Sequence, residues 1–393
     1  MSNESMPLQG LKVVELSHMV MGPSVGLILG DLGADVIKIE PPGGDKTRRL
    51  RGSGAGYFTM YNRNKRSVCI DVKSERGLAL VRELVSDADI LVENFRSGTM
   101  DRLGLSYAAL SELNPRLIYC SARGFLSGPY EQRTALDEVA QMMGGLAYMT
   151  GPPGRPLRAG ASVIDVTGGM FAVIAVLAAV EQRHRTSRGQ HLTSALYETT
   201  AFLVGQHMAQ LAVTGEAAKP MPVRISAWAI YDIFDTADAE QVFVAVVSDG
   251  QWQQFCTHFE LTEFAADRSL DENAARVARR DEILPRVREV LGRMDKAQLM
   301  EQLGKVGLPY APVAKPEDLF DDPHLNARGG MLDVTVPGGD ATRLPALPVQ
   351  FGSDRPGKRL DVPRAGEHTD AVLAELGIDA ATIAKMREAG LIS

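Results

Sequence analysis

Cysteine is scarce in this chain: its 393 residues include only Cys69, Cys120 and Cys256, which lie far apart and form no CxxC pair. Such spacing is typical of reduced thiols in a cytosolic protein. The amino-terminal sequence, MSNESMPLQG, has neither an apolar signal core nor an arginine-rich transit pattern. We therefore expect a cytoplasmic location.

Long apolar runs, a basic charge balance and a dinucleotide fingerprint are also lacking. The longest apolar stretch, 170–180, is much shorter than the roughly 20 residues that span a bilayer, so it predicts a buried helix and no membrane partner. The net charge of −7 argues against a nucleic-acid partner. Gly22, Gly26 and Gly30 lack the GxGxxG spacing that would indicate a nicotinamide enzyme.

What the sequence does contain, in its first half, is a regular alternation of apolar runs and helical patterns. This alternation is typical of an α/β fold in which helices cover both faces of a Rossmann-like parallel sheet. A short helix at 23–32 has proline near its start and Gly33 just past its end, both of which are favoured positions. The strands are predicted at 11–16, 36–39, 67–72, 90–93 and 117–121.

The pattern breaks at 217–222, and a differently built region follows. Two β-rich runs, 228–234 and 242–247, predict a hairpin that leads into a helix opening near Gly250. Helical segments are then predicted at 281–292 and 296–304. A chain of this length usually holds two domains, so a second domain is expected here.

One acid stands at a position where chemistry is expected. A strand at 161–164 would leave the Asp165 carboxylate at its carboxyl end, where open α/β sheets place their ligands. Gly168 and Gly169 would keep the following backbone free of side chains. By position alone, Asp165 is either a nucleophile or the N-cap of the helix that follows.

Several motifs carry a resemblance to one enzyme family. They are, in chain order, LKVVELSHMVMGPSVGLILGDLGADVIKIEPPGGDKTR, DILVENFRSGTMDRLG, the segment RPLRAGASVIDVTGG around Asp165, and the closing PRAGEHTD. The chain resembles the family III CoA-transferases, the group of formyl-CoA transferase, carnitine CoA-transferase and the α-methylacyl-CoA racemases. The resemblance implies a large CoA-binding domain, 1–221 with 326–393, and an inserted small α+β domain at 222–325. It also implies an interlinked homodimer.

The resemblance further implies the site residues. Asp165 is the nucleophile, and His18, Lys73, Asn94, Phe95 and Arg102 contact coenzyme A, which enters as part of the substrate while no cofactor or metal is permanently bound. Lys and Arg suit its phosphates, and an aromatic ring suits its adenine. Taken without the family, Lys73 and Arg102 would be solvated surface charges.

Asp137 matches an acidic position that orients the reacting carboxylates in these transferases. Its alternative interpretation is a cap for a helix beginning at Glu138. In racemases of the family a histidine precedes this acid, whereas here Leu136 stands in its place and cannot exchange protons. The racemase therefore remains the weaker alternative, beside a non-catalytic CoA-binding protein.

The resemblance implies transfer of CoA from an acyl-CoA to a small carboxylic acid, through an aspartyl anhydride and an aspartyl-CoA thioester. Formyl-CoA transferases carry glutamine where this chain has Val20, which disfavours formyl-CoA and oxalate. The stretch 224–256 resembles members that act on dicarboxylic acids. Arg155, Arg158 and Arg224 are candidates for holding a second carboxylate, because guanidinium binds carboxylate in a bidentate manner.

Overall fold

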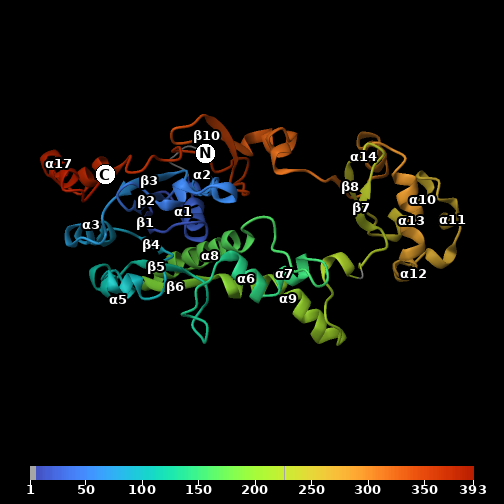
Figure 1. Ribbon diagram of the computed structural model, residues 1–393, viewed down its shortest axis with the longest axis horizontal. Coiled ribbons are helices and arrows are strands. Elements are labelled where there is room, and N and C mark those ends of the chain that lie inside the picture. The colour runs from blue at the N-terminus through green and yellow to red at the C-terminus, as the bar shows by residue number, and fades with distance from the viewer. Residues whose placement is uncertain (1–5, 225) are drawn as a thin grey trace. The chain divides into compact units, whose positions relative to one another are not determined.

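A computed structural model describes residues 6–224 and 226–393, which form two compact units. The larger unit contains residues 6–222 and 323–393, and the smaller unit contains 223–322 except the undescribed residue 225. The larger unit is built on a six-stranded sheet in the order β3-β2-β1-β4-β5-β6, whose labels follow one another in Figure 1. All neighbouring pairs in this sheet are parallel, which confirms the predicted parallel α/β architecture.

The strands of this sheet are β1 (Lys12–Leu16), β2 (Asp35–Glu40), β3 (Lys65–Cys69), β4 (Ile90–Glu93), β5 (Ile118–Arg123) and β6 (Gln190–Ala195). The positions of β1, β2, β4 and β5 agree with the predicted runs, whereas β6 is not among those runs and β3 begins two residues before the predicted 67–72. The pattern misses the start of β3 because charged residues are usually exposed and so do not indicate a buried strand. Lys65 is charged but fully buried in an ion cluster.

Helices cover both faces of this sheet. The carboxyl-terminal part of the chain, 323–393, also belongs to this unit and adds helices and a hairpin to it. The helices are α1 (Met21–Asp31), α2 (Tyr57–Tyr61), α3 (Glu75–Ser86), α4 (Thr99–Arg102), α5 (Tyr107–Leu113), α6 (Asp137–Met143), α7 (Leu146–Thr150), α8 (Val163–Thr186), α9 (Leu196–Thr214), α15 (Pro323–Asn326), α16 (Thr369–Glu375) and α17 (Ala380–Glu388). A hairpin of β10 (Met331–Thr335) and β11 (Ala341–Pro345) lies between α15 and α16.

The smaller unit is a three-stranded antiparallel sheet with helices packed around one apolar core. Its strands are β7 (Tyr231–Asp235), β8 (Gln241–Ala245) and β9 (Tyr310–Pro312), and the first two form the expected hairpin. Trp252, Phe255 and Leu299 are among the fully buried core side chains. Its helices are α10 (Asp249–His258), α11 (Thr262–Ala265), α12 (Asn273–Ala278), α13 (Arg280–Leu291) and α14 (Lys296–Val306).

The glycines of α1 have a packing role. A Cβ atom on Gly26 would lie 1.7 Å from Oε2 of Glu15, and one on Gly22 would lie 2.5 Å from Cβ of Ser17. Helix α1 therefore approaches the end of β1 more closely than any residue with a side chain would allow. This close approach encloses a buried polar cluster beneath the loop that follows β1.

The strand predicted at 161–164 is wrong, because α8 already begins at Val163. A short apolar run has the same pattern at the start of a buried helix as in a strand, and here the run continues for 24 helical residues. Gly168, Gly169, Ala172, Val173 and Val176 are among its buried residues.

The expectation that this apolar stretch forms a buried helix is only partly correct. Met170 and Ile174 on α8 are 48% and 59% exposed. Helix α8 is long and apolar enough to cross a membrane by length and composition alone, but the core helix of a soluble protein meets the same criteria.

Candidate functional site

A cavity of about 210 Å³ opens where β1, β4 and β5 end. Its wall includes six of the residues singled out from sequence, namely His18, Asn94, Leu136, Asp137, Arg158 and Asp165. These residues come from separate parts of the chain and meet because the carboxyl ends of parallel strands share one edge of the sheet. Phe95, Lys73 and Arg102 do not line this cavity.

Asp165 stands in the first turn of α8, close to the unsatisfied N–H groups of the helix end. The N-cap is Ser162, whose side chain makes no capping hydrogen bond, so the interpretation of Asp165 as an N-cap is wrong. The Asp137 carboxylate caps α8 instead: its Oδ2 accepts from the backbone N–H of Ile164 at 2.9 Å and from that of Asp165 at 3.0 Å.

Asp137 is itself the first residue of α6, with Leu136 as N-cap, so it does not cap a helix beginning at Glu138. It is 5% exposed and is held by its neighbours. The Gln141 side-chain amide donates to Oδ1 from one turn further along α6, and the Arg158 guanidinium lies 3.6 Å from the same oxygen. Gln141 was not among the residues predicted for the site, although its i,i+4 spacing from Asp137 is the signal for this contact.

Burial raises the pKa of the Asp165 carboxyl to about 7, and the nearby Asp137 and Glu138 carboxylates add to the rise. The Arg158 guanidinium opposes it. Desolvation and like charges both disfavour the ionised carboxylate. Asp165 is therefore an acid that changes its charge near neutral pH in an enclosed site, which is a frequent property of reactive carboxyl groups.

His18 and Asn94, which also line the cavity, are joined by hydrogen bonds. The Asn94 side chain accepts from the His18 backbone N–H at 3.0 Å and donates to the His18 carbonyl at 2.8 Å. The rings of His18 and Phe95 lie 5.7 Å apart. Both polar atoms of the Asn94 amide are thus used by the loop that carries His18.

Lys73 and Arg102 are exposed side chains that follow β3 and β4. The Arg102 guanidinium donates to the Thr99 hydroxyl at 2.9 Å. Lys73 lies four residues beyond the end of β3, and Arg102 is the last residue of α4, nine residues beyond the end of β4. The structure therefore does not gather them around Asp165.

Of the three arginines considered for a second carboxylate, Arg158 alone lines the cavity. Its guanidinium is paired with the half-exposed Glu138 and donates to the Ala161 carbonyl. Arg155 is exposed outside the cavity, and Arg224 belongs to the smaller unit. Leu136, at the position where racemases carry histidine, also lines the cavity. Within 6–224 and 226–393, no cluster of three or more His, Cys, Asp or Glu side chains could hold a metal ion.

Known proteins resemble this chain over nearly its whole length. The chain is 35% identical to the succinate–glutarate CoA-transferase of Agrobacterium fabrum, over 96% of the chain and 97% of that protein. It is 34% identical to the acetyl-CoA:oxalate CoA-transferase of Acetobacter aceti, over 94% of the chain and 95% of that protein.

A CaiB/BaiF family protein from Brucella suis, with a solved crystal structure, has the same fold. It superposes with a TM-score of 0.84 at 36% identity and covers 94% of the chain and 99% of its own. The model of CoA-transferase family III matches residues 8–369. With the sheet, the cavity and these relatives in agreement, the chain is a CoA-transferase and belongs to family III.

Proposed function

We propose that this enzyme moves CoA from an acyl-CoA thioester to a small dicarboxylic acid, with Asp165 as the nucleophile. The observation that carries the proposal is the Asp165 carboxyl, which lines a cavity at the sheet edge and has its pKa raised to about 7. A carboxylate at that position gives a covalent route, because it can take the acyl group from CoA, then hold CoA itself as a thioester and pass the CoA to a second acid.

In the proposed reaction, an ionised Asp165 oxygen attacks the thioester carbonyl. The new carbon–oxygen bond makes a mixed anhydride, and the carbon–sulfur bond breaks to release CoA thiolate. The thiolate then attacks the aspartyl carbonyl, which frees the first acid and leaves an aspartyl-CoA thioester. The acceptor carboxylate opens this thioester to a second anhydride, and the thiolate finally takes the new acyl group and restores Asp165.

The other residues at the site have supporting roles in this proposal. Asp137 fixes the first turn of α8 and thereby the backbone of Asp165. His18 and Phe95 would contact the CoA chain, whereas the exposed Lys73 and Arg102 suit its phosphates. Retention of the thiolate matters because bound partners react with effective molarities of about 10⁵ to 10⁸ M.

The proposed acceptor is a dicarboxylic acid. A relative named for succinate with glutarate and another named for oxalate support the dicarboxylic class, although Val20 disfavours oxalate itself as the acceptor. Arg158 is the arginine that can serve a distal carboxylate, since it lines the cavity and already pairs with the carboxylate of Glu138. A substrate carboxylate would replace Glu138 in a bidentate contact.

The test is to incubate the protein in D₂O with several acyl-CoAs and a pool of monocarboxylic and dicarboxylic acids, oxalate included, and to measure every thioester by mass. New thioesters of dicarboxylic acids are expected, with no deuterium at the α-carbon of the unchanged donor. Deuterium in an otherwise unchanged thioester would instead establish racemase chemistry. Thioesters that remain unchanged and unlabelled would contradict catalysis and favour a CoA-binding protein.

We also propose a cytoplasmic homodimer. Apolar side chains on α8 and α9 support it, since Ile174 is 59%, Phe202 71% and Met208 64% exposed. Exposed apolar patches on a soluble chain commonly mark protein interfaces. Sedimentation at micromolar concentration should give twice the chain mass of 42.5 kDa, and Phe202→Glu should shift the protein towards the single-chain mass. A wild-type protein that sediments as a single chain would contradict the dimer.

A further inference from the structure

The loop 17–20 after β1, hereafter the His18 loop, has its backbone held by side chains from elsewhere in the chain. Lys38 Nζ on β2 donates to the Ser17 carbonyl at 2.7 Å. Asn94 binds both the N–H and the carbonyl of His18, and the Thr47 hydroxyl accepts from the Met19 N–H at 3.1 Å. Four backbone groups in succession are therefore satisfied by three side chains.

The loop adopts a conformation that an L-residue does not favour. Met19 has a φ of 64°, in the left-handed region that is uncommon for residues other than glycine. Such a conformation persists where surrounding contacts fix it, and it is often found at functional sites. Here both His18 and Met19 line the cavity that contains Asp165.

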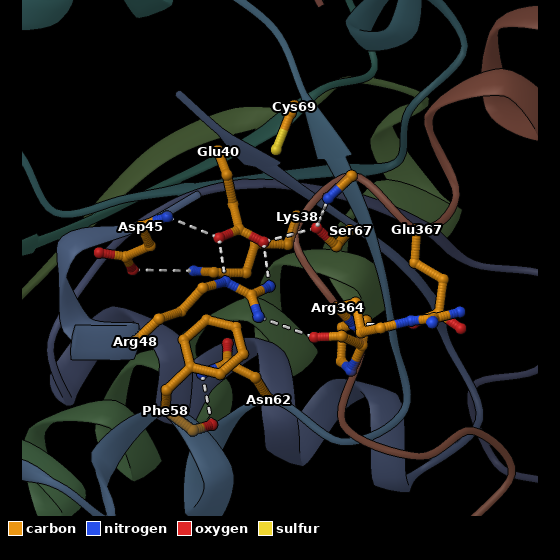
Figure 2. A network of polar contacts seen from close by, with 12 residues as sticks. Lys38, Glu40, Asp45, Arg48, Phe58, Asn62, Ser67, Cys69, Arg364 and Glu367 are labelled. Atoms are coloured by element: carbon orange, nitrogen blue, oxygen red, sulfur yellow. Dashed lines mark hydrogen bonds and ion pairs between the residues drawn. The ribbon is translucent and has the colours of Figure 1, made fainter. Parts of the chain in front are cut away.

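Two of the three side chains that hold the loop, Lys38 and Thr47, belong to a buried polar network. Lys38 is fully buried, with Glu15 at 3.1 Å and Asp45 at 3.7 Å. Thr47 donates to Asp45, whose backbone N–H donates to Glu40, and Glu40 receives a bidentate contact from Arg48. Figure 2 shows Lys38, Asp45, Glu40 and Arg48 in this network. Since Lys38 and Thr47 are buried, they are enclosed by the protein and not available to a ligand in the cavity.

We propose that Lys38, Thr47 and Asn94 are positioning residues that hold the His18 loop in its binding conformation before acyl-CoA arrives. Asn94 acts on the loop, because both polar atoms of its amide are used by His18. A loop that is ordered in advance loses less conformational entropy on binding, so CoA affinity depends on these contacts. The inference deepens the proposed function, since it assigns the loop to acyl-CoA binding.

The test compares Thr47→Val with Thr47→Ser, which keeps the hydroxyl. Thr369→Val is the matched control, because Thr369 is also buried and its hydroxyl accepts from the Cys69 N–H at 3.1 Å and donates to a backbone carbonyl. Two quantities are measured: hydrogen exchange of the Met19 amide in the ligand-free protein, and the Kd for free CoA by calorimetry. Asn94→Ala is a second variant, measured at the His18 amide.

Thr47→Val is expected to accelerate exchange at Met19 and to raise the Kd for CoA, each by roughly tenfold, the size of one lost buried hydrogen bond. Thr47→Ser and Thr369→Val should both stay close to wild type. Unchanged exchange at Met19 in Thr47→Val and at His18 in Asn94→Ala would overturn the inference, as would equal weakening of CoA binding by Thr369→Val. If wild-type protein does not bind CoA, the proposed function fails, and the exchange measurements alone still decide whether the loop is held.

Discussion

Asp165→Asn is expected to reduce CoA transfer by about 10⁴-fold or more, because loss of a covalent nucleophile removes the reaction path itself. The amide preserves the shape of the side chain, so the first turn of α8 and its contacts with Asp137 should persist. Transfer is measured by the appearance of new thioesters, and the covalent adduct by the mass of the peptide that contains residue 165. Residual transfer within about tenfold of wild type would contradict the role of Asp165.

The same variant should be more stable than wild type above neutral pH. The folded pKa of Asp165 is raised from 3.8 to about 7, so the native state holds a proton that the unfolded state releases. The contribution of this group to the free energy of unfolding is fully present below pH 4, decreases as pH rises, and is lost above about pH 7. At pH 8 the asparagine variant should therefore gain about 2–4 kcal/mol in free energy of unfolding. Denaturant titration at pH 8 and pH 4 measures the difference, which should disappear at the lower value.

The pH dependence of transfer provides the control for this argument. Wild-type kcat/KM should rise with pH through about 7, as Asp165 ionises. Glu138→Gln removes one neighbouring negative charge, so the midpoint should move to lower pH. A midpoint that does not move would show that this carboxylate does not contribute to the pKa of Asp165.

Glu15→Gln is expected to destabilise the fold by about 3–5 kcal/mol, since it removes the negative charge between two buried lysines. Lys65 Nζ lies 2.8 Å and Lys38 Nζ 3.1 Å from the Glu15 carboxylate, and all three side chains are fully buried. Burial works against the charged form of Glu15, but the two lysines hold its pKa below the ordinary value. The variant leaves both ammonium groups without this partner in a poorly solvated interior.

Glu181→Gln is the matched control for this prediction. Glu181 pairs with Arg185 one turn along α8, and both side chains are about 70% exposed. Exposed pairs of this kind contribute about 0.3–0.5 kcal/mol. Denaturant midpoints of the two variants at pH 7 measure the difference. If Glu15→Gln cost no more than Glu181→Gln, the buried cluster would not contribute measurably to stability.

Much of the larger unit could be predicted from local sequence, because its apolar strands and the proline and glycine positions of α1 are properties of short segments. The run at 161–164 was misassigned for a physical reason: a few apolar residues look alike in a strand and in the first turn of a buried helix. The start of β3 was missed because Lys65 is buried by partners that are distant in sequence.

Some features of the candidate site likewise follow from the sequence alone, whereas others depend on the fold. The sequence by itself determined the family motifs, the acid at 165, the acid at 137 and the leucine at 136, since these are identities and local spacings. Only the tertiary structure decided that Asp137 caps the helix of Asp165, that Arg158 lines the cavity, and that Asn94 holds the His18 loop. These relations join residues 27 to 76 positions apart or depend on burial, and pKa values follow from the same enclosure. The sequence specifies the chemical groups of each side chain, whereas folding determines which groups it contacts and how much water reaches it.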